Sequence, residues 1–448
     1  MDMNITVFGM AHSGKSTCIG YLYNKELEKN PEYDFEKQVM KNKEFIPEYD
    51  DSRDYGYLVD EFNEDWIKTH SQSGTTKRLH YKKIEIDGMF ITVIDTPGSE
   101  HKNVQRQKGM YYGDIGVFCI EIGQLLSDDL FSNRNFKAFF MATLLLWSKY
   151  HGSTIVAITK MDLCEYDEES YLMGCEIIKQ LCSDDISISD IVPISIDVKG
   201  RKSHNIDSAS EKMNWYNGKT LVEAIKSEIE AKSHICDEKP LLFYIDRMHL
   251  QTTHSGRSWR IKIIQGRIKQ GEQVVIAPVR INGEISSVTA RIKNIRLDLE
   301  KSVVGEQVVD NILSTSFAGI NLQDIKSGSR KLTKDDFETI YTSCGFSSKS
   351  AFKCSNKIIF KIGFQKFERV KEGRQMSLLW FGRAAQIQII TKRRVIDGAL
   401  VTAEFLNRSV AMPLDSNGKF LIKHMIIRYD SNMNEDPFLD AELIDIVE

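Results

Sequence analysis

The sequence predicts an α/β domain followed by two all-β domains, and three observations support this fold class. In the first half, short β-rich apolar runs alternate with helical stretches, which is typical of a parallel sheet with crossover helices. Beyond residue 236 the long helical patterns stop, and short strands recur with glycine-containing turns. The first apolar run leads directly into a glycine-rich loop and then into a helical stretch.

Five apolar runs are expected to form the parallel strands of the first domain, with helices between them at 15–23 and 136–149. The runs are Asn4–Phe8, Phe90–Ile94, Gly116–Ile120, Thr154–Ile158 and Ile191–Ile194. We expect this domain to cover residues 1–235. We place a first barrel at 236–333, a polar linker at 334–353 and a second barrel at 354–448.

The composition argues against several classes of protein. Lys+Arg 59 against Asp+Glu 63 gives a net charge of −4, so any RNA contact would need a local basic patch. The longest largely apolar stretch, Ala138–Trp147, is about half of the roughly 20 residues that a membrane helix needs. The 8 cysteines form no CxxC pair, which favours a reducing compartment. We therefore expect a cytoplasmic protein without a membrane segment.

The glycine-rich loop is a phosphate-binding motif. Residues 9–16 read GMAHSGKS, a full match to GxxxxGK[ST] between a strand and a helix. The glycines let backbone N–H groups point at phosphate oxygens, and Lys15 adds a positive charge. The Ser16 hydroxyl is the expected magnesium ligand. The expected nucleotide contacts of this loop are Gly9, His12, Ser13, Gly14, Lys15, Ser16 and Thr17.

A second motif supports a nucleotide phosphate site. Residues 95–98 read DTPG and directly follow the strand run FITVI. Asp95 at the end of a buried strand can hold Mg²⁺, and Gly98 can offer its N–H to a terminal phosphate. The spacing of about 80 residues after the glycine-rich loop favours a functional motif over a chance turn.

A third pair of motifs predicts the base. Residues 159–162 read TKMD after the strand run TIVAI, and VPIS follows at 192–195. The Asp162 carboxylate can accept hydrogen bonds from N1 and N2 of guanine, and adenine would leave it unpaired. Lys160 can lie across the base. The remaining expected base contacts come from Thr159, Ser195 and Ile196.

In this order, GMAHSGKS, SGTT, DTPG, TKMD and VPIS resemble the translation-factor GTPases, above all elongation factor 1 alpha and elongation factor Tu. MNWYNGKTLVEAI at 213–225 is also similar to the release-factor GTPase and to the GTPase subunit of sulfate adenylyltransferase. The resemblance implies an α/β P-loop GTPase domain followed by two all-β barrel domains, with GTP or GDP and Mg²⁺ as cofactors. It also implies that Thr76 is the switch threonine that ligates Mg²⁺ in the GTP state.

Several residues depart from the family pattern on the γ-phosphate side. The family has a histidine directly after DxPG, and here Ser99 stands there, followed by Glu100 and His101. His12 replaces an acid of the phosphate loop, and Thr159 replaces an asparagine as a weaker bridge. Ser99, His101 and Thr76 are thus the catalytic candidates. We expect hydrolysis that is slow or depends on a partner, and an activating or nucleotide-exchange partner. His101 or His12 replaces the missing histidine; alternatively, His101 is a solvated surface residue.

Three functions remain open from the sequence. The first is a GTP-controlled factor that binds tRNA or the ribosome. Its basic strip at 257–269 carries five basic residues and Trp259, with further basic groups at 365–374 and 391–394; alternatively these residues form solvated strand faces. The second is a regulatory GTPase subunit of an enzyme such as sulfate adenylyltransferase. The third is a low-turnover GTP sensor.

Overall fold

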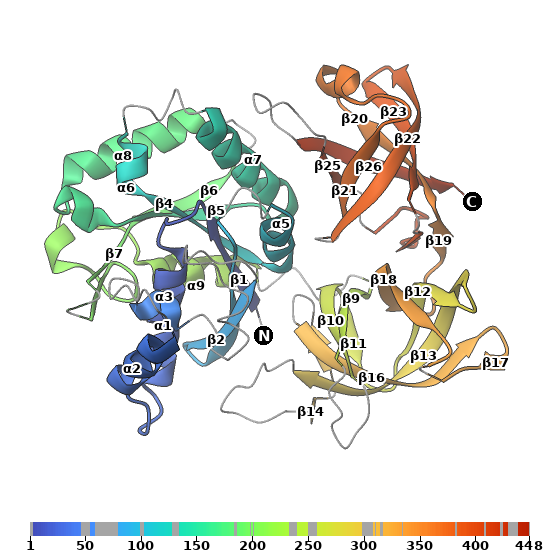
Figure 1. Ribbon diagram of the computed structural model, residues 1–448, viewed down its shortest axis with the longest axis horizontal. Helices are drawn as coiled ribbons and strands as arrows, with labels where there is room; N and C mark the ends of the chain where they lie inside the picture. The colour runs from blue at the N-terminus through green and yellow to red at the C-terminus, as the bar shows by residue number, and fades with distance from the viewer. Residues whose placement is uncertain are drawn as a thin grey trace. The chain divides into compact units, whose positions relative to one another are not determined.

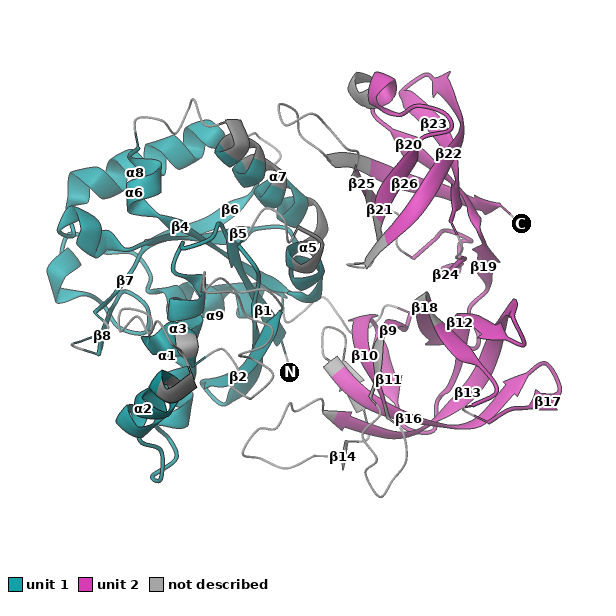
Figure 2. Ribbon diagram, viewed as in Figure 1, with its two compact units in different colours: residues 1–233 teal, residues 234–448 magenta. Residues whose placement is uncertain are grey.

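The computed structural model describes most of the chain, in two compact units, Met1–Ser233 and His234–Glu448 (Figure 2). The described residues are 3–45, 54–58, 79–98, 103–127, 134–182, 186–197, 199, 201–232, 240–249, 258–297, 308–309, 311–313, 317–333, 335–380, 383–406, 409–421, 424–428 and 438–447.

A six-stranded sheet with the order β2–β3–β1–β4–β5–β6 forms the centre of the first unit (Figure 1). Neighbours from β3 to β6 pair in parallel, and the edge strand β2 is antiparallel to β3. The five expected strands correspond to β1, β3, β4, β5 and β6. The bounds are β1 (Met3–Gly9), β2 (His80–Ile86), β3 (Met89–Asp95), β4 (Ile115–Glu121), β5 (Thr154–Thr159) and β6 (Ile188–Pro193).

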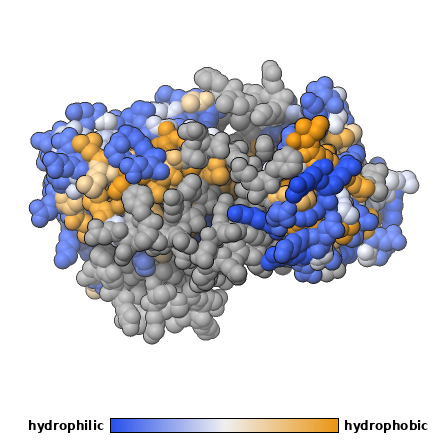
Figure 3. Space-filling view, turned by 90° about the horizontal axis from the view of Figure 1, so that it is seen from above, coloured by the Kyte–Doolittle hydropathy of each residue, from blue (hydrophilic) through white to orange (hydrophobic). Residues whose placement is uncertain are grey.

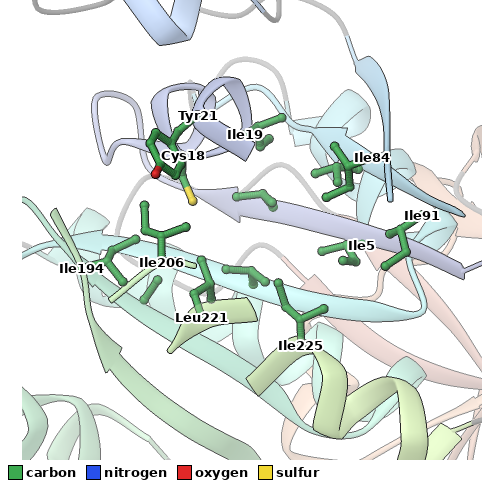
Figure 4. Close-up of a cluster of buried hydrophobic side chains, with 14 of the residues drawn as sticks. Ile5, Cys18, Ile19, Tyr21, Ile84, Ile91, Ile194, Ile206, Leu221 and Ile225 are labelled. Carbon is green, nitrogen blue, oxygen red and sulfur yellow. The ribbon is translucent and has the colours of Figure 1, made fainter. Parts of the chain in front are cut away.

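Helices cover both faces of this sheet, which explains why β1, β4 and β5 are almost continuously apolar. On one face lie α1 (Lys15–Leu27), α2 (Phe35–Phe45), α3 (Asp54–Tyr57) and α9 (Leu221–Lys232). Figure 4 shows the core on this face, with side chains from α1 (Cys18, Ile19, Tyr21), the strands (Ile5, Ile91) and α9 (Leu221, Ile225).

The other face packs against α5 (Asn103–Tyr112), α6 (Ile122–Leu125), α7 (Arg134–His151) and α8 (Glu168–Leu181). Trp147 of α7 is fully buried there, stacks on Phe8 with ring centroids 5.1 Å apart, and donates its Nε1–H to the Ser153 carbonyl at 2.9 Å. The Thr6 hydroxyl donates to the Gly109 carbonyl at 2.7 Å, so it ties α5 to β1. The sheet is therefore fixed between two hydrophobic cores, one on each face.

The second unit begins with a sheet of eight strands in the order β14–β13–β12–β18–β9–β10–β16–β17. Because β13 also pairs with β16, six of these strands close into a ring around a core that includes Trp259 and Phe337. The bounds are β9 (Leu242–His249), β10 (Ser258–Gln265), β12 (Gln273–Ile281), β13 (Glu284–Leu297), β14 (Val308–Val309), β16 (Phe317–Ser327), β17 (Arg330–Lys331) and β18 (Glu338–Ser347), with the separate pair β11 (Arg267–Lys269) and β15 (Asn311–Leu313).

The interpretation of 334–353 as a polar linker is wrong for most of that stretch. Strand β18 pairs with both β12 and β9, so it is an inner strand of the ring. Its Ser and Thr residues suggested a loop, but in the sheet their polar groups find partners: the buried Ser343 hydroxyl donates to the Pro278 carbonyl. Cys344 and Phe346 of the same strand are fully buried.

A closed barrel follows, made of β20, β23, β22, β21, β25 and β26. Its inward positions carry buried apolar residues at alternate sites, as the pattern along β20 shows with Ile358, Phe360 and Ile362. The fold class predicted from the sequence, an α/β domain followed by β-barrels, is thus confirmed. The bounds are β19 (Phe352–Ser355), β20 (Lys357–Ile362), β21 (Gln375–Trp380), β22 (Arg383–Val395), β23 (Gly398–Phe405), β24 (Val410–Pro413), β25 (His424–Arg428) and β26 (Phe438–Val447).

The described surface is mixed, with hydrophilic residues beside smaller hydrophobic areas in the view of Figure 3. In the part of the chain that the structure describes, no helix combines the length and the apolar content needed to cross a bilayer.

Gly20 marks a tight contact between α1 and α3. A Cβ at this position would lie 1.7 Å from the Tyr55 carbonyl oxygen. Alanine normally stabilises a helix interior over glycine by about 1 kcal/mol, but a backbone atom at this distance forces α3 to move. We predict that Gly20→Ala lowers the free energy of unfolding by about 1–3 kcal/mol, measured by urea unfolding with helical circular dichroism.

Gly174 in the middle of α8 supplies the matched control. The nearest atom to its added Cβ is the terminal Cδ1 of Ile122 at 3.3 Å, which can shift at little cost. Gly174→Ala is therefore expected to be neutral or slightly stabilising. Equal effects of the two substitutions would contradict the close packing of α3 on α1.

Candidate functional site

The glycine-rich loop joins the end of β1 to the start of α1 in a conformation that needs its two glycines. Gly9 has φ 145° and Gly14 has φ 79°, both in the region that favours glycine. A Cβ on Gly9 would lie 2.2 Å from the Cys119 carbonyl oxygen, so only glycine fits where β1 passes β4. The loop thus starts against β4 and ends at a helix N-terminus, which attracts anions.

Lys15 is buried within the loop. Its ammonium donates to the Met10 carbonyl, and it lies 3.4 Å from the Ser13 hydroxyl. Burial lowers the pKa of Lys15 from its usual value, while the nearby Asp95 carboxylate acts in the opposite direction. Phosphate oxygens beside this ammonium would add to the negative charge of Asp95 and further offset the cost of burying the cation.

Asp95 lies opposite Ser16, the second residue of α1. The Ser16 hydroxyl donates to Asp95 Oδ2 at 2.6 Å, which joins the end of β3 to the start of α1. Gly98 lies against the loop from the same side, since a Cβ there would meet the Ala11 nitrogen at 2.5 Å. The DTPG segment and the glycine-rich loop therefore form one continuous polar site at the end of β1 and β3.

Thr159 links the base motif to the phosphate loop. Its hydroxyl, on a residue that is 3% exposed, lies 3.0 Å from the Ser13 carbonyl oxygen and 3.2 Å from that of Ile120. The hydroxyl has a single proton and two acceptors within reach, one in the phosphate loop and one in β4. The expected bridge is therefore present, although a threonine forms it.

Asp162 and Ser195 also lie together. The Ser195 hydroxyl donates to Asp162 Oδ1, and the Met161 N–H donates to the Ile194 carbonyl at 3.3 Å. An ionised carboxylate has about four acceptor positions, so Asp162 can bind Ser195 and a guanine edge together. Ser195 begins β7 (Ser195–Asp197), where Ile196 pairs with Ser203 of β8 (Lys202–His204).

Lys160 has a partner that the sequence reasoning missed. Its ammonium lies 2.7 Å from Glu121 Oε2 at the end of β4. Lys160 adopts φ 59° directly before the short 3₁₀ helix η3 (Met161–Cys164). Glu121 is the last residue of β4 and directly follows the apolar run Gly116–Ile120, where a single acid indicates only the end of a strand.

The remaining site candidates differ in what the structure says of them. His12 is exposed, with φ 64°, at the outer turn of the phosphate loop, and Thr17 follows Ser16 in the first turn of α1. Thr76, Ser99 and His101 lie outside the described residues.

Two thiols, Cys18 and Cys119, lie buried near Lys15, and burial raises the pKa of Cys119 to about 12. Burial therefore favours the protonated form of both thiols.

The basic strip at 257–269 is not an exposed surface at its centre. Arg260 and Lys262 of β10 are each 2% exposed. Trp259 packs in the barrel core against Phe337, with ring centroids 5.6 Å apart. Neither an RNA-phosphate surface nor a solvated strand face describes these residues. In the closed barrel, by contrast, Arg394 is exposed and pairs with Glu368 at 3.2 Å.

Comparison with known proteins agrees with this geometry. Residues 2–334 match the family model described as the elongation factor Tu GTP binding domain. Elongation factor 1-alpha of Thermococcus onnurineus (strain NA1) is 26% identical over 340 residues, covering 73% of this chain and 69% of that protein. Elongation factor 1-alpha of Metallosphaera sedula is 26% identical over 339 residues, covering 73% of this chain and 70% of that protein.

Solved structures share the fold at low sequence identity. The S. cerevisiae Ski7 GTPase-like domain, bound to GDP and inorganic phosphate, has a TM-score of 0.74 at 13% identity and covers 99% of this chain and 97% of its own. Elongation factor SelB of Methanococcus maripaludis, in complex with the GTP analogue GPPNHP, has a TM-score of 0.60 at 14% identity and covers 100% of this chain and 80% of its own. The resemblance found in the motifs is confirmed: the chain belongs to the family of the elongation factor Tu GTP binding domain, a family of translation-factor-like GTPases.

Proposed function

We propose that this protein binds GTP and GDP and that the nucleotide state controls its binding of a macromolecular partner. One observation carries the proposal: hydrogen bonds join the segments after β1, β3, β5 and β6 at the carboxyl ends of these strands, with the expected phosphate residues beside the expected base residues. Lys15, Ser16 and Asp95 supply the phosphate side. Asp162 and Ser195 supply the base side, and Thr159 joins the two.

The residues at the phosphate side fit a magnesium ion. Mg²⁺ prefers hard oxygen ligands and keeps several waters, so one hydroxyl and one carboxylate beside the phosphates suit it. The Ser16 hydroxyl and Asp95 Oδ2 are this pair, 2.6 Å apart. We propose that both hold the ion, directly or through its waters, with Thr76 as a further ligand in the GTP form. The ion would neutralise charge on the terminal phosphates.

We propose that GTP hydrolysis is slow or depends on a partner. Ser99 follows DTPG, where the family carries a histidine that orients the attacking water. A serine side chain is too short to reach the same position, and it cannot become cationic. His101, two residues further on, is the alternative donor of an imidazole.

The proposed partner is RNA of the translation apparatus, either tRNA or the ribosome. The support is the family itself and the names of the relatives, which are translation elongation factors. A switch of this kind changes partner affinity only through contacts that differ between the GTP and GDP forms. An enzyme subunit or a different protein partner remains the competing outcome of the experiment below.

Ser99→His should restore a water-orienting imidazole. We predict that single-turnover hydrolysis of preloaded GTP becomes faster by about 10-fold or more, since positioned acid–base groups contribute at least this much. Ser99→Ala is the control, because it changes the side chain without adding an imidazole and should leave the slow rate unchanged. No increase with Ser99→His would show that Ser99 does not limit the rate.

Retention of partners by the two nucleotide forms tests the switch. The protein is immobilised with a non-hydrolysable GTP analogue or with GDP, and bound RNA and protein are identified. We predict that tRNA or ribosomal components bind only in the GTP form and that this binding falls steeply as salt rises. Identical partners in both forms would contradict nucleotide control. Retention of an enzyme subunit by the GTP form would contradict the proposed translation partner but would support nucleotide control.

A further inference from the structure

The Glu121–Lys160 ion pair lies on the base side of the site and has a role that sequence motifs do not assign. Glu121 Oε2 lies 2.7 Å from Lys160 Nζ, and the two side chains are 18% and 38% exposed. Glu121 directly precedes α6, in the N-cap position, where a side-chain oxygen can accept a backbone N–H of the helix. In the described structure its carboxylate makes no such capping bond and faces Lys160 instead.

The backbone around Lys160 is already fixed by other contacts. Before Lys160, the Thr159 hydroxyl donates to the Ser13 carbonyl. After Lys160, the Met161 N–H donates to the Ile194 carbonyl. What remains free to move is the four-carbon stem of the lysine itself. A lysine stem loses considerable rotamer entropy when it is ordered, so a fixed ammonium lowers the entropy still to be lost on binding.

We propose that Glu121 is a positioning residue for nucleotide binding, holding Lys160 so that its stem is ordered for contact with the purine ring. This inference rests on the proposed function, because it assumes that the base lies beside Asp162 and Lys160. Glu121 would act through Lys160 and would not touch the nucleotide. Because the stem contacts the face of the ring, the effect should be on affinity rather than on the choice between guanine and other purines.

Affinity for GDP in the presence of Mg²⁺, measured by calorimetry on the full chain, tests the inference. We expect Glu121→Gln to raise the Kd by about 3–10-fold, the effect of freeing one long side chain. The melting temperature should change little, because a partly exposed ion pair contributes little to stability. Glu176→Gln is the matched control, since Glu176 pairs with Lys179 at 2.6 Å on the exposed surface of α8.

A double-mutant cycle separates positioning from a general structural role. Lys160→Met keeps an unbranched apolar stem but removes the ammonium that Glu121 binds. In the Lys160→Met background, Glu121→Gln should change the Kd by less than about 2-fold. An unchanged Kd for Glu121→Gln alone, or the same loss in both backgrounds, would overturn the inference.

Binding of GDP to the unchanged protein separates a failure of the Glu121 role from a failure of the proposed function. If it binds GDP and Glu121→Gln behaves like the Glu176→Gln control, only the role of Glu121 is wrong. If the unchanged protein binds no GDP, the proposed function itself fails.

Discussion

The close approach of β1 to β4 at Gly9 is the constraint on which the site depends. At this point the backbone of β1 leaves no space for a Cβ beside the Cys119 carbonyl. The phosphate loop begins here, at the carboxyl ends of the parallel strands, where β3, β4 and β5 also end. In parallel sheets the connections at this edge are the usual place for ligands.

A second level of order comes from hydrogen bonds between the loops themselves. Ser16 to Asp95 joins α1 to β3, and Thr159 joins β5 to the phosphate loop and to β4. Displacement of any of these segments would move the proposed phosphate contacts and the proposed base contacts together. This coupling suits a protein whose affinity for a partner depends on which nucleotide it holds, because a change at the phosphates can reach the whole edge.

Much of this arrangement could be predicted from the sequence because parallel strands bring their carboxyl ends together. The motifs at residues 9, 95, 159 and 195 each follow an apolar run, and that alone places them at one edge. Strand β18 was missed because its hydroxyl groups look like loop residues until their partners in the sheet are known. Arg260 and Lys262 are buried although they alternate with the core residues Trp259, Ile261 and Ile263 of β10, and the alternation in the sequence indicates the opposite. Glu121 was missed for a similar reason, since an ion pair between two strand ends has no periodicity.

The proposed function depends most directly on recognition of guanine by Asp162. In Asp162→Asn the amide can donate to a xanthine carbonyl but no longer accepts two hydrogen bonds from the guanine edge as a carboxylate does. The measurement is the Kd of the unchanged protein and of this variant for GDP and for xanthosine diphosphate. We predict that the variant loses GDP affinity by about 100-fold or more and gains affinity for xanthosine diphosphate. Unchanged preference in the variant would contradict a guanine site at this edge of the sheet.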